Sequence, residues 1–305
     1  MSSLIINPYA FAAASDTGQI AQLSGSSASN TYTAASEFYD IPTDVWSAAF
    51  NIASGARGRA GSAGNPTHCY LLGGQDGSGY FDEIDRVAWA DETQNTTTMS
   101  GNRAWGNTVS NGISVCVGQS YYYVSYLNGI NEFTYSAMTE TTQGSTSAPH
   151  PFGGNFGNST YGFAVNGNTT GLNRYTYSDK SNTGSGFTNS PTSSYTNGQS
   201  GNSTTGLSVN TTAGAGNTRG DGYNYSSDSW TTGSFTSTTT YETGMQAGST
   251  ADNLYTTQTN TSVARSCEKY NYNDGTLSAF TSVATELDGG DAGAGASSNN
   301  VGVSS

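Results

Sequence analysis

Side chains that could perform acid–base or metal chemistry are few in this chain. It has two histidines: His68 precedes the apolar stretch CYLLGG, and His150 lies in the segment APHPFGG. Neither belongs to an HExxH metalloprotease pattern, and no GxSxG nucleophile elbow occurs. A shared histidine site would therefore have to be assembled by the fold alone. We expect the protein not to be an enzyme.

Carboxylates are the other candidates for catalysis. They gather in FDEID (Asp82, Glu83, Asp85), in SDSW (Asp228) and in ELDGGD (Glu286, Asp288, Asp291). A sialidase-type hydrolase would show repeated Ser-x-Asp-x-Gly-x-x-Trp motifs, but none occurs, and SSDSW lacks the glycine. A copper oxidase of the galactose-oxidase kind would need two Tyr and two His ligands at one place, and no pattern positions them. An enzyme that acts on carbohydrate is therefore only an alternative.

Metal binding is weakly indicated. The stretches DGSGYFDE (residues 76–83) and DGGDAG (residues 288–293) place oxygen ligands suited to Ca²⁺ on Gly-rich segments. They lack the ligand spacing of a calcium loop, so ordinary Asx turns are the simpler interpretation. The cysteines Cys69, Cys116 and Cys267 form neither a CxxC pair nor a disulfide framework. We expect no cofactor, with calcium as the alternative.

Composition restricts the partners. Charged residues are only 10% of the 305 residues, and the net charge is −13. The nine basic residues are spread along the chain, which argues against binding nucleic acid through its phosphates. No stretch approaches the roughly 18 apolar residues that a membrane-spanning helix needs, so we expect no membrane insertion. An acidic surface rich in hydroxyl groups suits an exposed, extracellular protein.

An aromatic repeat predicts the architecture that must position these groups. The second aromatic of each copy is Trp89, Tyr135, Tyr177, Tyr225 and Tyr272, at spacings of 46, 42, 48 and 47 residues. Around them, aromatic and β-branched residues alternate with polar ones, and Gly, Asn and Asp mark turns. About 40–50 residues accommodate four short strands, which make one blade of a β-propeller. We predict an all-β propeller.

The repeated rings are expected to form the core between blades. Aromatics at positions i and i+2 share one face of a strand, and that face can pack against the neighbouring blade. The predicted blade-core aromatics are Trp89, Phe133, Tyr135, Tyr175, Tyr177, Tyr223, Tyr225, Tyr270 and Tyr272.

The two ends of the chain are expected to share one blade. Residues 36–52 read as two outer strands, and the C-terminal stretch DGGDAGAGASSNNVGVSS resembles the first two strands of a blade. A closed ring leaves no unpaired blade edge at the joint. Five internal copies and this shared blade make six four-stranded blades, with seven as the alternative if a degenerate copy lies within residues 1–35. We assign residues 1–35 to an arm and linker, and residues 36–305 to the propeller.

One copy resembles a kelch repeat. CYLLGGQDGSGYFDEIDRVAWADETQ, residues 69–94, has a hydrophobic run, a Gly73-Gly74 pair, a spacer and an aromatic strand that contains Trp89. The other copies match the pattern loosely, because their diglycine is replaced by other pairs. The family's glycines serve backbone packing, so this resemblance implies a fold and no activity.

The N-terminal stretch LIINPYAFA resembles the openings of many tailed-bacteriophage virion proteins, and the Gly/Ser/Thr/Asn-rich composition is similar to that of phage tail and fibre proteins. Residues 12–35 read as a linker. This resemblance implies an assembly arm, and packing of the same apolar residues on the propeller's own flank is the alternative. The arm residues are Leu4, Ile5, Ile6, Pro8, Tyr9 and Phe11.

Three functions follow as expectations. The first is a virion structural or appendage protein (a tail fibre, neck or decoration component) that presents a propeller for assembly or host attachment. Its partners would be other virion proteins and further copies of itself. The second is a lectin for host surface glycans, in which exposed rings such as Tyr121, Tyr122 and Tyr123 stack on sugars. The third is the carbohydrate-acting enzyme considered above.

Overall fold

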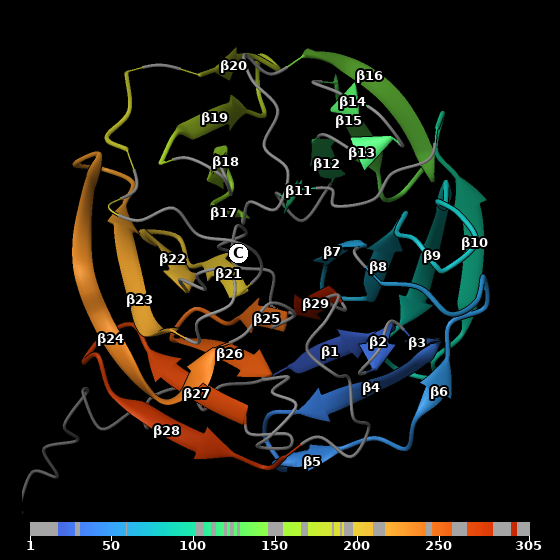
Figure 1. Ribbon diagram of the computed structural model, residues 1–305, viewed down its shortest axis with the longest axis horizontal. Helices are drawn as coiled ribbons and strands as arrows, with labels where there is room; N and C mark the ends of the chain where they lie inside the picture. Colours follow the sequence, from blue (N-terminus) through green and yellow to red (C-terminus); the bar gives the residue numbers. More distant parts are fainter. Residues whose placement is uncertain are drawn as a thin grey trace, which may run out of the picture.

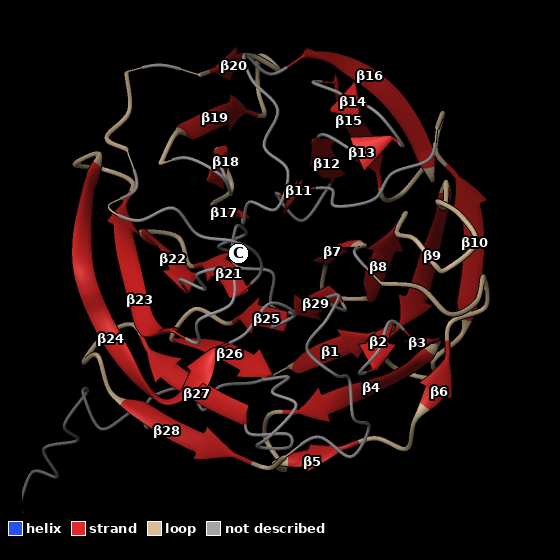
Figure 2. Cartoon of the chain, in the orientation of Figure 1, coloured by secondary structure: helices blue, strands red, loops and turns tan. Residues whose placement is uncertain are grey.

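Short antiparallel sheets arranged in a ring make up the fold (Figure 1). The structure is a computed structural model, in which every regular element is a β-strand (Figure 2). It describes residues 18–27, 31–58, 60–101, 107–110, 114–118, 121–122, 125–126, 129–145, 155–165, 170–184, 186–189, 191, 198–209, 217–241, 246–257, 267–282 and 294–297. This described part contains no helix that is long and apolar enough to span a membrane.

Each blade has four strand positions from the axis to the rim. The innermost strands are β29 (Ala294–Ser297), β7 (Gly61–Gly64), β11 (Asn107–Ser110), β17 (Asn155–Gly157), β21 (Gly198–Gly201) and β25 (Gln246–Ser249). The second strands are β1 (Gln19–Leu23), β8 (His68–Leu72), β12 (Ser114–Gly118), β18 (Tyr161–Val165), β22 (Thr205–Val209) and β26 (Asn253–Thr257).

The outer half of each blade completes the sheet. The third strands are β4 (Ala35–Asp40), β9 (Glu83–Ala88), β15 (Gly129–Thr134), β19 (Leu172–Thr176), β23 (Asn217–Asn224) and β27 (Cys267–Asn271). The outermost strands are β5 (Val45–Trp46) with β6 (Phe50–Asn51), β10 (Gln94–Thr98), β16 (Thr139–Ser145), β20 (Asn182–Thr183), β24 (Ser229–Tyr241) and β28 (Leu277–Phe280). Two small hairpins, β2 (Gly25–Ser27) with β3 (Thr31–Thr33) and β13 (Tyr121–Tyr122) with β14 (Ser125–Tyr126), interrupt second-to-third strand connections.

The predicted propeller is confirmed. Five four-stranded sheets and one sheet built from both ends of the chain form the ring, so the closing sheet brings the blades to six. Neighbouring innermost strands contact one another in the order β29, β7, β11, β17, β21, β25 and back to β29. The described residues form no seventh four-stranded sheet.

The closing sheet differs in detail from the prediction. The C-terminal stretch supplies only the innermost strand β29 among the described residues, and the second strand is β1, which pairs antiparallel with both β29 and β4. The prediction that residues 12–35 form a linker is therefore wrong for residues 19–23. Their sequence QIAQL buries four of its five side chains, which a solvated linker would not do.

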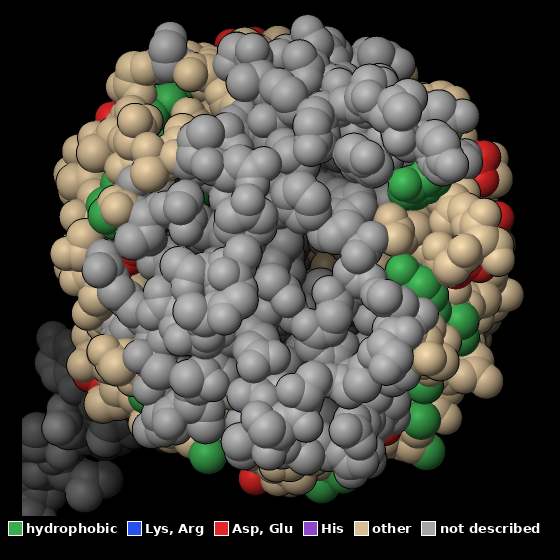
Figure 3. Space-filling model, in the orientation of Figure 1, with side chains coloured by type: hydrophobic (Ala, Val, Ile, Leu, Met, Phe, Trp, Pro, Cys, Tyr) green, Lys and Arg blue, Asp and Glu red, His purple; other side chains and the backbone are tan. Residues whose placement is uncertain are grey.

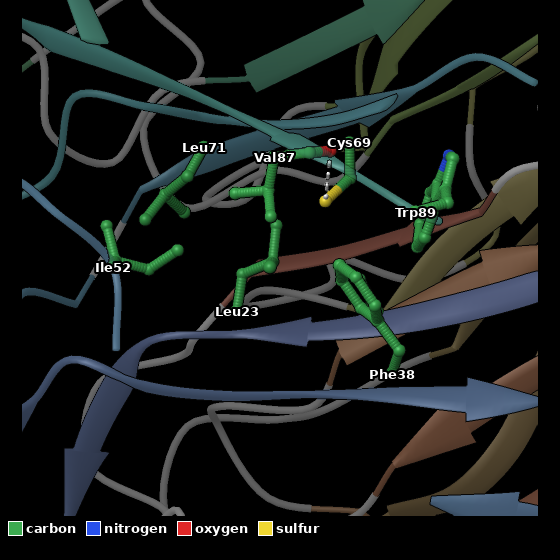
Figure 4. Close-up of a cluster of buried hydrophobic side chains, with 8 residues drawn as sticks. Leu23, Phe38, Ile52, Cys69, Leu71, Val87 and Trp89 are labelled. Carbon is green, nitrogen blue, oxygen red and sulfur yellow. Dashed lines mark hydrogen bonds between the residues drawn. The ribbon is translucent and has the colours of Figure 1, made fainter. Parts of the chain in front are cut away.

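The core consists of separate apolar clusters between neighbouring blades, and the described residues show them at five of the six seams. Figure 4 shows the cluster between the closing sheet and the β7–β10 sheet, where Leu23 and Phe38 meet Leu71 and Trp89. The Phe38 and Trp89 ring centroids lie 4.9 Å apart. Cys69 belongs to the same cluster, and burial raises the pKa of its thiol, which therefore stays protonated at neutral pH. It acts there as a small apolar side chain.

Near the axis the innermost strands approach closely because they carry small residues. A Cβ atom at Gly61 of β7 would lie 2.3 Å from the Thr108 Cγ2 of β11. Thr108 Oγ1 also donates a hydrogen bond of 2.7 Å to the Ser62 carbonyl. Glycine at position 61 thus sets the spacing between these two blades.

We expect Gly61→Ala to destabilise the protein by about 1–3 kcal/mol, because the added methyl overpacks this contact. Thr108→Ser keeps the hydroxyl and removes Cγ2. In that background Gly61→Ala should change the unfolding free energy by no more than about 0.5 kcal/mol. Chemical denaturation of the four proteins checks this. Equal costs of Gly61→Ala in both backgrounds would contradict the proposed contact.

Candidate functional site

The third strand of every blade carries the same pattern on the face that meets the preceding blade. The pattern is a buried polar residue, followed at i+2 and i+4 by large apolar or aromatic residues. The polar members are Glu37, Asp85, Asn131, Asn173, Asp221 and Glu268, all at most 3% exposed. This regularity identifies Asp85 of the FDEID stretch as one copy of a structural position rather than part of a carboxylate cluster.

The predicted blade-core aromatics occupy the other two positions of this pattern. Seven of them are buried: Trp89, Phe133, Tyr135, Tyr175, Tyr177, Tyr223 and Tyr270. Tyr225 and Tyr272 are partly buried and pack against the same clusters. Their rings stack on the preceding blade, as Tyr135 does on Tyr70 at 4.2 Å between centroids and Tyr225 on Phe163 at 5.3 Å. They contribute to cohesion between blades.

A positive-φ residue follows each polar position, always seven residues later, in the turn to the outermost strand. These residues are Asp44, Glu92, Met138, Lys180, Asp228 and Gly275. In four of the copies the residue two positions beyond, which is Trp46, Gln94, Glu140 or Trp230, forms a hydrogen bond with the preceding blade. Gln94, for example, donates through Nε2 to the Asn51 carbonyl at 2.7 Å and accepts through Oε1 from the Ala53 amide at 2.7 Å.

Two copies of this turn form a larger set of contacts that we call the rim clamp. In the first, Tyr39 Oη donates to Asp44 Oδ1 at 2.8 Å, and the Thr281 amide of the preceding blade donates to the same oxygen at 3.0 Å. Trp46 Nε1 donates to the Thr281 carbonyl at 2.8 Å. In the second copy, Tyr223 Oη donates to Asp228 Oδ1 at 2.5 Å, and the Thr188 amide of the preceding blade donates to the same oxygen at 3.2 Å. Trp230 Nε1 donates to the Thr188 carbonyl at 2.9 Å.

Charge is part of the first rim clamp. The hydrogen bond from the Thr281 amide, and then that from Tyr39, lowers the pKa of the Asp44 carboxyl. Burial, and next the bond to Asp44, raises the pKa of the Tyr39 hydroxyl. The clamp is therefore complete at neutral pH, with an ionised Asp44 as the acceptor of both bonds.

A buried ion pair links the closing sheet to the β7–β10 sheet. Arg57 Nη2 lies 2.6 Å from Asp85 Oδ2, and both side chains are 0% exposed. Thr96 Oγ1 donates to the other carboxylate oxygen at 2.6 Å, and Ser54 Oγ bonds to both partners of the pair. Burial lowers the pKa of the Arg57 guanidinium, and the Asp85 charge opposes that shift. The Arg57 backbone binds Ser24 of the closing sheet.

Two of the other predicted sites, Asp76 and His68, lie within the described residues and make local contacts there. Asp76 of the DGSG stretch accepts backbone bonds from Ser78 and Gly79, both 2.7 Å, which is an Asx turn. His68 contacts the Thr67 hydroxyl at 2.8 Å, and burial lowers the pKa of its imidazole. Within the described ranges no group of three or more His, Cys, Asp or Glu is placed to hold a metal ion.

Several predicted residues fall outside what the structure describes. The whole arm, Leu4 to Phe11, the second calcium stretch at residues 288–293, and Tyr123 lie there. Tyr121 and Tyr122 form β13, which pairs with β14 apart from the four-stranded sheet; nothing is described of their side chains.

Sequence reasoning missed Arg57, the rim clamps and Arg174, which is considered below. The constant seven-residue interval between the polar position and the turn was a usable signal for the clamps. Arg57 and Asp85 are 28 residues apart, and no local pattern links them.

One face of the propeller carries short turns within each blade. Because strands alternate in direction, first-to-second and third-to-fourth connections lie on one face, which we call the turn face. Its turns are short and regular: Asn65, Asn158 and Asn202 each accept bonds from backbone amides two and three residues later. Figure 3, a view down the ring, shows acidic side chains at several points of the rim.

No protein-family model matches this chain, and no curated protein is detectably similar to it. The kelch and phage resemblances therefore stay predictions, and the geometry above carries the functional argument.

We expect Asp44→Asn to lower the unfolding free energy at pH 7 by at most about 1 kcal/mol, because the Asp44 carboxylate is exposed to solvent. The folded-state pKa of Asp44 lies below its unfolded value of about 3.9. Its contribution is therefore present above about pH 4 and is lost as the pH falls through the folded-state pKa. Denaturation between pH 7 and pH 2 should show the two proteins converging; a gap that persists in acid would contradict this.

Arg57→Met should cost about 3–5 kcal/mol of stability, because it leaves the Asp85 carboxylate buried and unpaired. The double variant Arg57→Met/Asp85→Asn removes both charges and should recover much of that loss. Arg86→Met, on the neighbouring, partly exposed position of β9, is the control and should change stability by about 0.5 kcal/mol or less. If the double variant were no more stable than Arg57→Met, the ion pair would not be the cause.

Proposed function

We propose that this protein is a structural or appendage component of a bacteriophage virion, such as a tail fibre, neck or decoration protein. In this proposal its β-propeller is a rigid exposed module for assembly or host attachment, and its partners are other virion proteins and further copies of itself. The proposal draws on the N-terminal resemblance and on the way the ring is built.

The observation that carries the proposal is the place where the N-terminal segment joins the propeller. Ile20 and Ser297 are register partners in the closing sheet, so the described chain begins and ends side by side. This point lies on the turn face, where the other blades have their first-to-second strand turn. An apolar segment attached there can dock on a larger assembly while the rim and the opposite face stay free to meet a partner.

The contacts between blades also support a rigid module. The large rings and the polar positions of the third strands are used between neighbouring blades, and the rim clamps add hydrogen bonds at the outer edge. A rigid module of this kind suits a role in display or attachment.

A lectin is the second candidate. The inserted β13–β14 hairpin, which contains Tyr121 and Tyr122, pairs apart from the four-stranded sheet. In a virion appendage this activity and the structural role would coexist.

Deletion of residues 2–17 tests the arm and preserves β1, which begins at Gln19. We expect the full-length protein to form symmetric oligomers and the truncated protein to be a folded monomer of unchanged strand content. Native mass spectrometry and circular dichroism measure both properties.

The matched control replaces Leu4, Ile5 and Ile6 by serine in the full-length chain, and it should behave as the deletion does if apolar docking is the cause. Identical monomers in all three cases would overturn the arm as an assembly element. The proposed virion role would then have only the sequence resemblance in its favour.

A further inference from the structure

Arg174 of β19 occupies an unusual environment. Its guanidinium carbon lies 4.4 Å from the centre of the Tyr161 ring and 4.7 Å from the centre of the Phe187 ring. The side chain pairs across the sheet with Phe163 and points toward the next blade, as Phe163 does. Two rings thus hold one guanidinium at the seam between the β17–β20 and β21–β24 sheets.

No protein group neutralises this cation among the described residues. Arg174 Nε is buried without a hydrogen-bond partner, while the residue as a whole is partly exposed. Arg57, which also lies over a ring, Phe81 at 5.2 Å, differs because it has an ion pair with Asp85. That Arg174 has no ion pair with a described residue is notable in a chain with 22 acidic and nine basic residues.

The acidic side chains nearby are engaged elsewhere. Asp179 accepts a hydrogen bond from the Ser181 amide at 3.0 Å. Asp228 Oδ1 accepts those of the second rim clamp, from Tyr223 and Thr188. Neither carboxylate forms an ion pair with Arg174. The hydrogen bonds from Ser181 are the main cause that lowers the pKa of Asp179, and the Arg174 charge adds the smallest contribution.

We infer that Arg174, between Tyr161 and Phe187, is a binding subsite for the carboxylate of an acidic sugar on a surface glycan. A guanidinium fixed by two rings presents its N–H groups in a planar fork, which matches a carboxylate in two parallel bonds. The partly exposed edges of the two rings offer apolar contact to the C–H groups of a sugar ring. This inference rests on the proposed role in host attachment and names its ligand class.

The local arrangement favours an acidic sugar over a simple anion. A free anion would be repelled by the net charge of −13 and would gain only the contact with the guanidinium. A ligand that adds ring contacts offsets that repulsion. With one cation and two rings, we expect a dissociation constant on the order of 1 mM for a monosaccharide.

Titration with glucuronate, followed through the NMR signal of the Arg174 Nε–H group, tests the inference. Methyl glucoside and acetate are the comparison ligands, because one lacks the carboxylate and the other lacks the sugar ring. Glucuronate should give a saturable shift, and each comparison ligand should bind at least about tenfold more weakly.

Variants assign the effect to the residues. Arg174→Lys retains the charge without the planar fork and should weaken glucuronate binding at least about tenfold, read by calorimetry. Phe187→Ala should also weaken it. Arg86→Lys is the matched control, because Arg86 pairs with Tyr70 as Arg174 pairs with Phe163. Among the described residues no ring contact of this kind is formed by Arg86, so this variant should leave binding unchanged.

Three results would overturn the inference: no saturable shift, equal binding of acetate and glucuronate, or full binding by a folded Arg174→Lys protein. Thermal unfolding of each variant confirms folding before binding is judged. Because this experiment measures ligand binding and the N-terminal deletion measures assembly, failure of one is distinguishable from failure of the other.

Discussion

The contact of each third strand with the preceding blade is the constraint on which the structure depends. A buried polar side chain and two large side chains, at alternate positions, meet the neighbouring sheet in every blade. A sheet of four short strands cannot bury this face alone, so each blade needs its neighbour. Ring closure then follows from the chain itself, because β29 and β1 complete one sheet from opposite ends of the sequence.

This constraint also decides where function can reside. Aromatic and carboxylate side chains that suggest chemistry in the sequence are largely occupied between blades, as Tyr223 and Asp85 are. Groups without such a structural use are the ones left for recognition. Arg174 has no ion pair with a described residue, and the described chain begins at Gly18 beside the end of β29 on the turn face. The proposed attachment role combines these two features.

The period of the aromatics predicted the propeller, the closing blade and most of the core, because repeated rings at i and i+2 have few other uses in a strand. The boundary at residue 36 was wrong, since QIAQL is too short and too polar to distinguish a strand from a linker without its partners β29 and β4. The Arg57–Asp85 pair and the ring environment of Arg174 depend on contacts between distant residues, which the fold alone creates. Met138 and Lys180 are residue types that rarely adopt a positive φ, so their identity does not predict the turn conformation that they have.

Native-state hydrogen exchange with increasing denaturant tests the central claim most directly. If contacts between blades hold the ring as one unit, the slowest amides of β4, β9, β15, β19, β23 and β27 should converge on one unfolding free energy. Because the rings and clamps join each blade to its neighbour, the account predicts that no blade opens alone. The opening free energies of these amides, plotted against denaturant concentration, should then merge into a single curve. Separate curves, with blades opening one by one, would contradict it.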